Sequence, residues 1–528
     1  MSLELQQAIQ SYENYISDNG IDESVIDAMI EACKVAYQTE KDIPYALKVS
    51  ARTKEIIENF VLNLTGTDIW GLEKYSFENK VKYEIIDRFY EVLLLEAQNK
   101  IVDSGFRYLE RKREPKERFY MPRRKQFLKI GLVDALQGMI DDKYDILCIS
   151  LIPGAGKTSV EKFFNALVIG WFPKDFTLFY SHSGDITRMY YDGVYDIVTN
   201  TDEYTWNEIF PDLHVTSTNA KMEQFNVGKY KPFPSVQCTS VGSKNAGKVR
   251  ASKFLLVDDM IGGIEEAMNP SILDKLWDKY AVDARQRKIQ DTDGKNCKEI
   301  HIATRWSVHD VIGRIQNMYA GNPRVKVIAV PDIDPVTGES NFEYEYSGFT
   351  KDFFADQQLL MDDISYRCLY KQEPIEREGL LFPDDKIRRY LHLPHGEPEM
   401  ITAQCDTKGK GTDYFVMPVL QKYGEDYYCV DCVCDNTADY EMQYENASNA
   451  IVNNEVQECE FERNAGGDRV AMEVNKRVEQ KGWICNITDV PTETNKEARI
   501  FQCSNWILQH VIFKDCLLYT SDAADDLT

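Results

Sequence analysis

A glycine-containing turn stands between an apolar run and a helical stretch in residues 147–159, which read LCISLIPGAGKTS. Backbone N–H groups in such a turn can converge on phosphate oxygens, while Lys157 would reach the terminal phosphates and the Thr158 hydroxyl would hold Mg²⁺. The pattern G-x-x-x-x-G-K-[ST] is incomplete, because Leu151 takes the place of its first glycine. By itself the turn fits a chance strand–turn–helix equally well. The predicted phosphate-binding residues are Pro153, Gly154, Ala155, Gly156, Lys157, Thr158 and Ser159.

Two adjacent carboxylates follow the apolar run FLLV, well downstream of Lys157. ATP hydrolysis needs one carboxylate at a strand end for the Mg²⁺ shell and a second that positions or deprotonates the attacking water. Asp258 fits the first role and Asp259 the second, although Glu is more usual at the second position and Asp is one methylene shorter. Because the pair follows the glycine turn in the expected order, the two motifs together predict an ATPase.

A polar residue, Thr304, ends the next apolar run, IHIA. At a strand tip it is placed to sense whether the terminal phosphate is present, and its alternative role is a simple helix N-terminus. Trp306 beside it is predicted to pack in a core.

The composition is that of a globular chain with roughly two to four domains, since 43% of its 528 residues are hydrophobic and 12% are aromatic. Its longest apolar stretch, residues 163–172, is far shorter than the roughly 20 residues that a membrane span needs. The N-terminus has no secretory signal pattern. The 13 cysteines show no paired framework and fit reduced thiols, so we expect a cytoplasmic protein. Cys429, Cys432 and Cys434 lie in a strand-like run and are predicted to be buried thiols rather than zinc ligands.

The net charge of −25 argues against a surface that is coated by nucleic acid, because phosphate binding relies on Lys and Arg. One local exception lies between Arg107 and Lys129, where ten basic residues stand against three acidic ones. On composition alone this stretch is predicted to be a solvated helical face.

The elements that must position these residues follow from periodicity. Residues 1–105 have helix-period apolar positions and few glycines, which predicts a helical region. Strand-like runs at 176–181, 254–259, 300–304 and 325–330 alternate with helical stretches, so we expect a largely parallel sheet with its ligand at the carboxyl ends of the strands. The fold class is therefore α/β.

A second pattern follows a linker rich in Pro, Gly and charge. The runs ITAQCD, YFVMPVLQ and YYCVDCVC predict an antiparallel meander, followed by a helix near 438–454, a strand, a helix at 468–480 and a further strand. The predicted organisation is a helical region at 1–105, an ATPase domain at 106–372, a linker at 373–400, a second α/β domain at 401–515 and a tail at 516–528.

The segments VDDMIGGIEEAMNP, IATRWSVHDVIGRI and QEPIEREGLLF, in this order, resemble the large terminase subunit of tailed double-stranded DNA bacteriophages. The resemblance runs from about Tyr120 to Phe513. That family joins a translocating P-loop ATPase to a ribonuclease-H-like nuclease, and the resemblance implies the same two domains here.

The resemblance also implies roles for individual residues of the ATPase domain. Gln126 would contact adenine, Lys157 and Thr158 would hold phosphate and metal, and Asp258 would hold metal. Asp259 would be the catalytic acid, and Thr304 would couple hydrolysis to movement. An arginine must reach the transition-state phosphate, and the choice between Arg188 and Arg250 stays open, since each could equally be a surface cation or a DNA contact.

The nuclease half of the family needs acidic residues around two divalent metals, either Mg²⁺ or Mn²⁺. Asp406 ends the first strand of the meander, with Asp413 downstream, and resembles the family's first catalytic aspartate. Glu462 ends the strand after the helix. Glu460 lies on the same strand face, but the glycines at 466 and 467 match the family pattern only if Glu462 is the ligand.

The family supplies a third carboxylate beyond the segment that ends in HVIF. Here that region reads CLLYTSDAADDLT, and residues 516–526 resemble a translated sequencing adapter. We expect this tail to be an artefact, with a true acidic tail as the alternative, so its aspartates are not taken as the missing ligand.

The predicted function is a DNA-packaging motor subunit that hydrolyses ATP, moves double-stranded DNA into a procapsid and cuts concatemers. The resemblance implies a homo-oligomeric ring at the portal protein, a small terminase subunit as partner, and action in the host cytoplasm without a membrane. The alternatives are a helicase-like P-loop ATPase fused to a nuclease, and a non-enzymatic capsid or portal adaptor.

Overall fold

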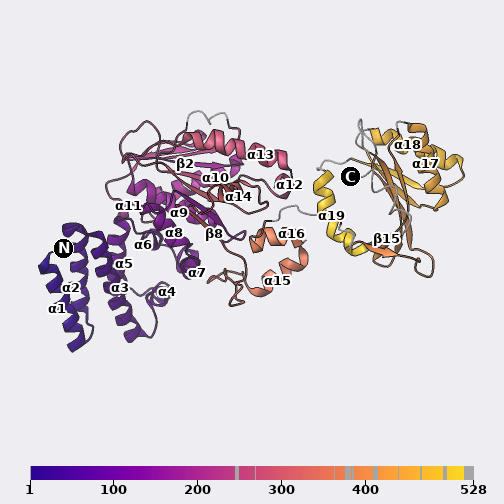
Figure 1. Cartoon of the computed structure of the whole chain (residues 1–528). Helices are drawn as coiled ribbons and strands as arrows, with labels where there is room; N and C mark the ends of the chain where they lie inside the picture. Colours follow the sequence, from indigo (N-terminus) through magenta and orange to yellow (C-terminus); the bar gives the residue numbers. More distant parts are fainter. Residues whose placement is uncertain are drawn as a thin grey trace. The chain divides into compact units, whose positions relative to one another are not determined.

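The computed structural model describes residues 2–243, 249–267, 269–361, 363–374, 382, 386–407, 414–437, 439–463, 466–491 and 496–515. The chain forms two compact units, Met1–Glu376 and Arg377–Thr528. Each unit contains its own sheet (Figure 1). No helix among the described residues is long and apolar enough to cross a membrane.

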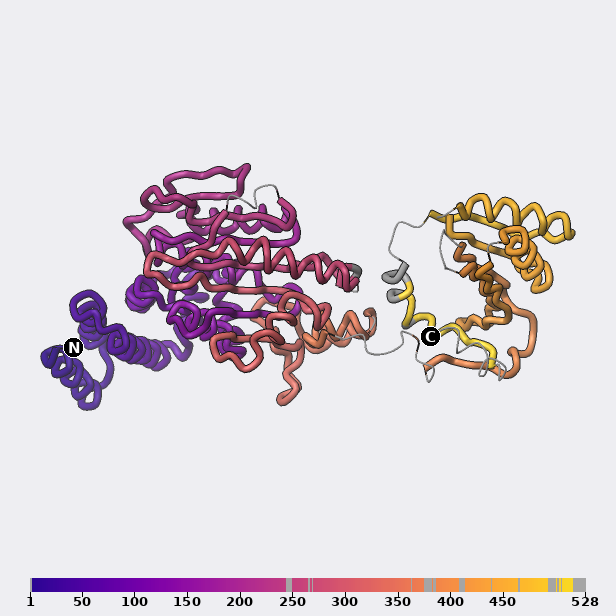
Figure 2. The backbone as a smooth tube through the Cα atoms, turned by 45° about the horizontal axis from the view of Figure 1, so that its top comes forward, coloured from indigo at the N-terminus to yellow at the C-terminus, as the bar shows by residue number. Residues whose placement is uncertain are grey.

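The first unit begins with helices, as predicted. Figures 1 and 2 show them as a group at the N-terminal end of the unit. Their apolar faces share one continuous core with the sheet that follows. The helices are α1 (Leu3–Asn19), α2 (Glu23–Lys34), α3 (Ile43–Thr65), α4 (Ile69–Asn79), α5 (Glu84–Gln98) and α6 (Val102–Leu109).

The sheet of the first unit has eight strands, and the five strand pairs among β5, β2, β6, β7, β1 and β8 are parallel. The antiparallel edge strands β3 and β4 were not predicted from the sequence. The strands, in sheet order, are β3 (Val215–Asn219), β4 (Gln224–Val227), β5 (Val236–Ser240), β2 (Thr177–Ser181), β6 (Phe254–Asp258), β7 (Lys298–Ile302), β1 (Ile146–Ser150) and β8 (Val325–Ala329).

Both faces of this sheet are covered, because alternate residues of the central strands belong to different cores. Leu147 and Leu256 pack with α6, α8 (Leu132–Ile140), α9 (Lys157–Trp171) and α10 (Gly184–Thr199). Cys148 and Val257 pack with residues of α14 (Val311–Met318) on the other face. Strands buried on both sides read as continuous apolar runs, and the predicted α/β class with a mainly parallel sheet is confirmed.

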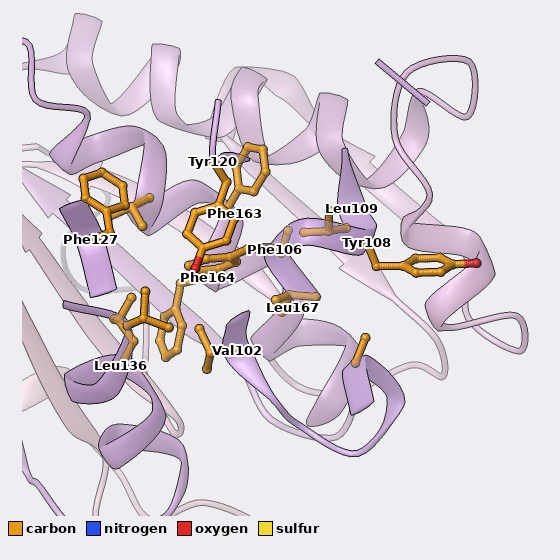
Figure 3. Close-up of a cluster of buried hydrophobic side chains, with 14 of the residues drawn as sticks. Val102, Phe106, Tyr108, Leu109, Tyr120, Phe127, Leu136, Phe163, Phe164 and Leu167 are labelled. Carbon is orange, nitrogen blue, oxygen red and sulfur yellow. The ribbon is translucent and has the colours of Figure 1, made fainter. Parts of the chain in front are cut away.

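Helix α6 fixes α9 in place through aromatic contacts. The Phe106 ring lies 6.0 Å from that of Phe163 and 5.0 Å from that of Tyr120, centroid to centroid. Figure 3 shows these rings with Phe164 and Leu167 in one cluster. The helix that starts at the glycine turn is thus anchored to the N-terminal helices.

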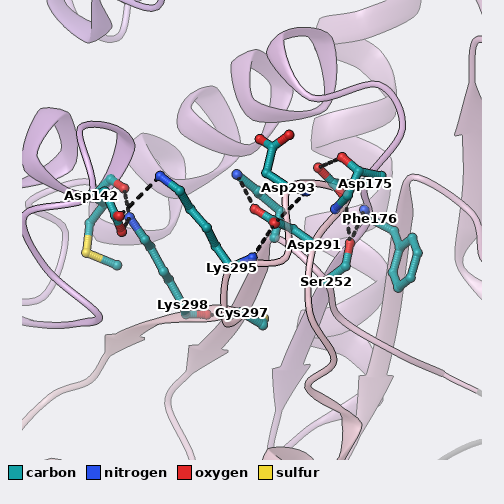
Figure 4. Close-up of polar contacts among 12 residues, drawn as sticks. Asp142, Asp175, Phe176, Ser252, Asp291, Asp293, Lys295, Cys297 and Lys298 are labelled. Atoms are coloured by element: carbon teal, nitrogen blue, oxygen red, sulfur yellow. Dashed lines mark hydrogen bonds and ion pairs between the residues drawn. The ribbon is translucent and has the colours of Figure 1, made fainter.

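The amino-terminal edge of the sheet is closed by polar contacts (Figure 4). Asp175, just before β2, accepts hydrogen bonds from Ser252 Oγ (3.3 Å) and Thr292 N (2.9 Å). Lys298, at the start of β7, pairs with Asp142 at 3.0 Å. These contacts tie together the starts of neighbouring strands, so the opposite, carboxyl edge is left for a ligand.

The basic stretch at 107–129 is not a solvated helical face, so that prediction was wrong. Arg118 is buried against Glu73, and Arg124 pairs with Asp103 at 2.7 Å. Most of the other cations in the stretch also have partners within the first unit, among them Arg111, Lys112, Arg113 and Lys129. These charges stabilise the connection between the helices and the sheet, because partners far away in sequence neutralise them.

The second unit has a seven-stranded sheet, in which β10, β11 and β12 form the predicted antiparallel meander. Helices α17 (Tyr440–Asn453) and α18 (Gly467–Gln480) pack on its core, and α19 (Lys496–His510) precedes the last strand. Strand β9 lies within the predicted linker. The strands, in sheet order, are β14 (Asn486–Val490), β13 (Glu458–Glu462), β10 (Met400–Cys405), β11 (Phe415–Tyr423), β12 (Asp426–Asp435), β15 (Val511–Lys514) and β9 (Arg388–Tyr390).

Candidate functional site

The glycine turn lies between β1 and α9, at the carboxyl edge of the first sheet. Gly154 and Gly156 have φ angles of +76° and +98°, a region that L side chains rarely adopt. At Gly156 a Cβ would also lie 2.6 Å from the Phe119 ring. Position 156 therefore requires glycine for two reasons: its φ angle is positive, and the Phe119 ring leaves no space for a Cβ atom.

Lys157 is the first residue of α9 and is 9% exposed. Its Nζ donates to the carbonyl oxygens of Leu151 (2.7 Å) and Ile152 (3.2 Å). Burial lowers the pKa of this amine, and the carboxylates of Asp259 and Asp258 partly oppose that shift. The ammonium group thus lies inside the turn, within reach of any phosphate that the turn would hold.

Thr158 and Asp258, far apart in sequence, are hydrogen-bonded, with the Thr158 Oγ1 donating to Asp258 Oδ2 at 2.7 Å. The pairing follows from the topology, because Asp258 ends β6 and α9 begins at the same edge of the sheet. Burial and the neighbouring charge of Asp259 raise the pKa of Asp258 to about 7. A buried carboxylate beside a hydroxyl oxygen fits a divalent cation, which would compensate the charge of the carboxylate.

Asp259 is held in a left-handed backbone conformation, with φ +36°. Its Oδ1 accepts a hydrogen bond from the backbone N–H of Thr304 at 2.9 Å, and its carbonyl oxygen lies 2.5 Å from His182 Nδ1. Burial raises the pKa of Asp259. Backbone strain of this kind in a non-glycine residue is typical of functional sites. Asp259 and Thr304 therefore lie together, linked through the Thr304 backbone rather than its hydroxyl.

Gln126, in α7 (Arg124–Lys129), lies beside a segment that covers the turn. Its Nε2 donates to Glu343 O at 2.7 Å, and its Oε1 is buried with no hydrogen-bond partner among the described residues. In the same segment, the Tyr344 hydroxyl donates to Ala155 O at 3.2 Å. The amide oxygen of Gln126 is thus available to a ligand, and its predicted adenine contact stays a prediction.

Arg123 was not among the site residues predicted from the sequence. Its guanidinium lies over the rings of Phe119 and Tyr344, 4.9 and 5.0 Å from their centroids. Its Nε is buried without a hydrogen-bond partner in the described part of the chain, and it would be 3.6 Å from a Cβ on Gly156. The sequence RRKQ at residues 123–126 indicates a basic segment, but only the three-dimensional structure shows which of its cations lies beside the phosphate turn.

Glu110, also missed, holds this cation in place. Its carboxylate accepts hydrogen bonds from the backbone N–H groups of Phe119 (2.7 Å), Tyr120 and Met121. Those three residues lead directly to Arg123. The end of the N-terminal helices is therefore connected to the phosphate turn by one buried carboxylate.

Arg188 and Arg250, the two candidates for the arginine that reaches the transition-state phosphate, lie in different parts of the first unit. Arg188, in α10, pairs with Asp192 at 2.9 Å and donates to Ala220 O at 2.7 Å. Arg250 precedes β6, so it lies toward the edge of the sheet opposite Asp258, and its Nη1 donates to Val249 O. Neither contacts the phosphate turn, and the choice between them stays open.

In the second unit, Asp406 and Glu462 come directly after paired residues of neighbouring parallel strands, since Cys405 of β10 is opposite Phe461 of β13. The two carboxylates therefore occupy opposing positions at the carboxyl edge of the sheet. Thr407 Oγ1 donates to Glu462 O at 3.3 Å. A Cβ on Gly467 would lie 1.8 Å from that same carbonyl oxygen, which explains why the start of α18 needs glycine there.

Other predicted residues of this half are only partly placed. Asp413 and the tail at 516–528 lie outside the described residues. Glu460 is opposite Gln404, one step before the paired strand ends. Among the described residues no group of three or more His, Cys, Asp or Glu side chains could hold a metal ion. The prediction that Cys429, Cys432 and Cys434 are buried thiols was wrong, because Cys432 and Cys434 are exposed and Cys429 is only partly buried.

Another carboxylate, Asp435, ends β12 at the same edge and is buried, with its Oδ2 unpartnered among the described residues. It lies two strands from β10, roughly 9–10 Å at the usual strand spacing.

Residues 405–511 match the family model described as the ribonuclease-H-like domain of the terminase of bacteriophage T7. No curated protein matches the sequence.

Solved structures of terminases are also similar to this chain. The large terminase of a thermophilic bacteriophage, in complex with ADP, is 12% identical over 75% of this chain and 89% of that chain, with a TM-score of 0.36. The HK97 bacteriophage large terminase is 10% identical over 72% and 84%, with a TM-score of 0.32. The Mn-soaked, inhibitor-bound terminase nuclease domain of human cytomegalovirus is 10% identical over 25% and 72%, with a TM-score of 0.20.

The family match falls on the unit that contains Asp406 and Glu462, and the unit with the phosphate turn precedes it along the chain. Residues 405–511 thus match the ribonuclease-H-like domain of a bacteriophage terminase, and for these residues the predicted resemblance to the large terminase subunit of tailed bacteriophages is confirmed.

Proposed function

We propose that this chain is the ATP-hydrolysing and DNA-cutting subunit of a viral DNA-packaging motor. The observation that carries the proposal is the hydrogen bond between Thr158 and Asp258, because it joins the phosphate turn to the strand-end acid that a P-loop ATPase needs. The terminase family match of residues 405–511 supports a nuclease in the second unit.

In the ATPase site, Thr158 and Asp258 would hold the Mg²⁺ that accompanies ATP and neutralises charge on its phosphates. Lys157 would exchange its bonds to Leu151 O and Ile152 O for phosphate oxygens. Asp259, fixed by Thr304 N, would orient the attacking water and accept its proton. Movement of the Thr304 segment on loss of the terminal phosphate would then link hydrolysis to translocation.

In the nuclease site, Asp406 and Glu462 would hold Mg²⁺ or Mn²⁺, with Asp413 as a further ligand. The metals supply Lewis-acid stabilisation of the leaving oxygen and an activated water. The carboxylates fix the position of the scissile phosphate relative to that water. Opposed carboxylates on adjacent parallel strands support this assignment, since both can reach one ion.

The motor would act as a ring on the portal of a procapsid in the host cytoplasm, with a small terminase subunit choosing the DNA. A ring allows an acidic chain to hold DNA, because basic surfaces gathered around a central channel create a local positive potential.

The test is to measure ATP turnover by the full chain with and without linear duplex DNA, and cleavage of circular plasmid with Mg²⁺ or Mn²⁺. We expect DNA to stimulate ATP hydrolysis and a divalent metal to be required for cleavage. Absence of ATP turnover in a folded protein would contradict the motor, and cleavage that persists in a chelator would contradict the metal nuclease.

A further inference from the structure

A cavity of about 490 Å³ lies in the N-terminal helical region, and none of its lining residues belongs to either proposed active site. The lining residues come from the end of α4, the start of α5 and the segment after α6; Figure 1 labels these three helices. Its volume falls within the roughly 300–1,000 Å³ typical of ligand sites. The proposed motor function uses none of its lining residues.

The polar groups in the floor of the cavity are satisfied within the protein. Tyr90 is 3% exposed, and its hydroxyl accepts a hydrogen bond from Arg118 Nη1 at 3.1 Å. Glu73, also in the floor, pairs with the fully buried Arg118 guanidinium at 2.9 Å. Because these charges satisfy each other, the floor contains no free ion.

The cationic side chains at the rim form two groups, one with ionic partners and one without them among the described residues. Arg111 lies 3.6 Å from Asp87, and Lys112 pairs with Glu208 at 2.9 Å, so these charges are already compensated. Lys80 and Lys82 have no ionic partner in the part of the chain that the structure describes, and both are exposed. Lys80 also has a left-handed backbone, with φ +54°, which a non-glycine residue adopts at some cost.

Two apolar side chains stand at the same rim. Phe77 is 38% exposed and Val81 is 42% exposed, and both line the cavity. A hollow of mixed lining, with two exposed apolar side chains and two ammonium groups that have no ionic partner among the described residues, is complementary to a ligand that combines an apolar group with negative charge.

We propose that this cavity binds an acidic peptide segment of a partner protein, with one aromatic or aliphatic side chain inserted and neighbouring carboxylates at Lys80 and Lys82. Ammonium groups on flexible stems suit carboxylates in varied positions, whereas no free arginine fork for bidentate phosphate recognition is present among the described lining residues.

A nucleic acid fits the same surface less well. The exposed acids Glu78 and Glu84 flank the two lysines in sequence, and Asp87 lies in the rim itself. Duplex DNA carries about one charge per 1.7 Å of axis, so these acids would repel it, while a peptide with two or three carboxylates can avoid them.

The test uses the full chain and three fluorescein-labelled peptides: DEWLED, the basic analogue KRWLRK, and DEGGED, which lacks the apolar pair. Binding is measured by fluorescence anisotropy up to about 1 mM protein, the range of weak specific contacts. We expect binding of DEWLED alone, with an affinity that falls as salt is added.

The decisive variant is Lys80→Glu with Lys82→Glu, which should weaken DEWLED binding at least about tenfold. Its matched control is Lys41→Glu with Lys48→Glu. This control makes the same charge change on exposed lysines outside the cavity, and Lys41 shares the φ of +54°. Thermal midpoints of all variants establish that they are folded.

Three results would overturn the proposal. They are no DEWLED binding to the wild type, equal binding by the cavity variant and the control, or binding of single-stranded or duplex DNA that depends on Lys80 and Lys82 while DEWLED does not bind. None of these depends on ATPase or nuclease activity, so failure here is separable from failure of the proposed function.

Discussion

Replacement of Gly156 by alanine tests the geometry of the phosphate turn quantitatively. The residue has φ +98°, and its new Cβ would lie 2.6 Å from Phe119 Cε2 and 3.0 Å from Phe119 Cζ. The left-handed backbone costs about 1–2 kcal/mol for a residue with a side chain. Forcing a methyl group into a packed contact adds about 1–3 kcal/mol. The expected loss of stability is therefore about 2–5 kcal/mol.

Gly131→Ala is the matched control, because Gly131 also precedes a helix with a positive φ, +72°, but has no atom within 4 Å of its Cβ position. The stability of Gly131→Ala should decrease only by the cost of a left-handed backbone, about 1–2 kcal/mol. Thermal unfolding of the full chain would compare the two midpoints.

Nucleotide binding gives a second measurement on the same pair. Gly156→Ala should bind a fluorescent ATP analogue at least about tenfold more weakly, because a displaced turn no longer directs its N–H groups at the phosphates. Gly131→Ala should bind as the wild type does. Equal stabilities for the two variants, or unchanged ATP affinity in Gly156→Ala, would contradict the tight packing of Gly156 in a phosphate-binding turn.

Further predictions concern Glu110 and Asp258 in the first unit and Asp406 in the second. Glu110→Ala should lower the stability by about 3 kcal/mol or more, since it leaves three buried N–H groups without an acceptor, while exposed Glu114→Ala should leave the thermal midpoint unchanged. Because Asp258 has a pKa of about 7 when folded and 3.8 ordinarily, Mg²⁺–ATP affinity should rise with pH up to about 7 and then level off; a flat profile between pH 5.5 and 8.5 would contradict this. Because the pKa of Asp258 is higher in the folded protein, the free energy of unfolding of the metal-free protein should decrease as the pH rises from about 4 to 7. Asp258→Asn should remove both the pH dependence of Mg²⁺–ATP affinity and this pH dependence of stability. Asp406→Asn should reduce metal-dependent plasmid nicking at least about 100-fold with ATP turnover retained, and unchanged nicking would exclude Asp406 as a ligand.

Much of the scaffold could be predicted from local pattern. The run predicted at 254–259 is a strand over Phe254–Asp258, because both faces of the sheet are covered and its positions are apolar until the chain reaches the edge. Asp258 is recognisable for that reason, as the first acid after a buried apolar run. The run predicted at 300–304 is a strand over Lys298–Ile302, displaced by two residues because the buried residues Lys298 and Glu299 carry no apolar signal. Strands β3 and β4 were missed because β3 is largely exposed, and because the four residues of β4 include Gln224 and Asn226 and so form no apolar run.

The roles of the cations depended on contacts that no local pattern contains. Arg118 and Arg123 stand in the same basic stretch, yet one is buried against Glu73 and the other lies over two rings beside the phosphate turn. Two of these partners, Glu73 and Tyr344, are far away in sequence. The left-handed backbone of Asp259 likewise follows from contacts with two other strand ends, at His182 and Thr304.

ATP turnover and DNA nicking, measured in the same folded preparation of Lys157→Ala, separate the two proposed activities. Lys157 lies in the phosphate turn of the first unit, and the proposed nuclease carboxylates lie in the second. We expect DNA-stimulated ATP hydrolysis to be lost while metal-dependent nicking persists, and we expect exposed Lys116→Ala to retain both activities. Undiminished ATP hydrolysis by Lys157→Ala, or equal loss of both activities in a folded variant, would contradict this assignment of the two activities to separate units.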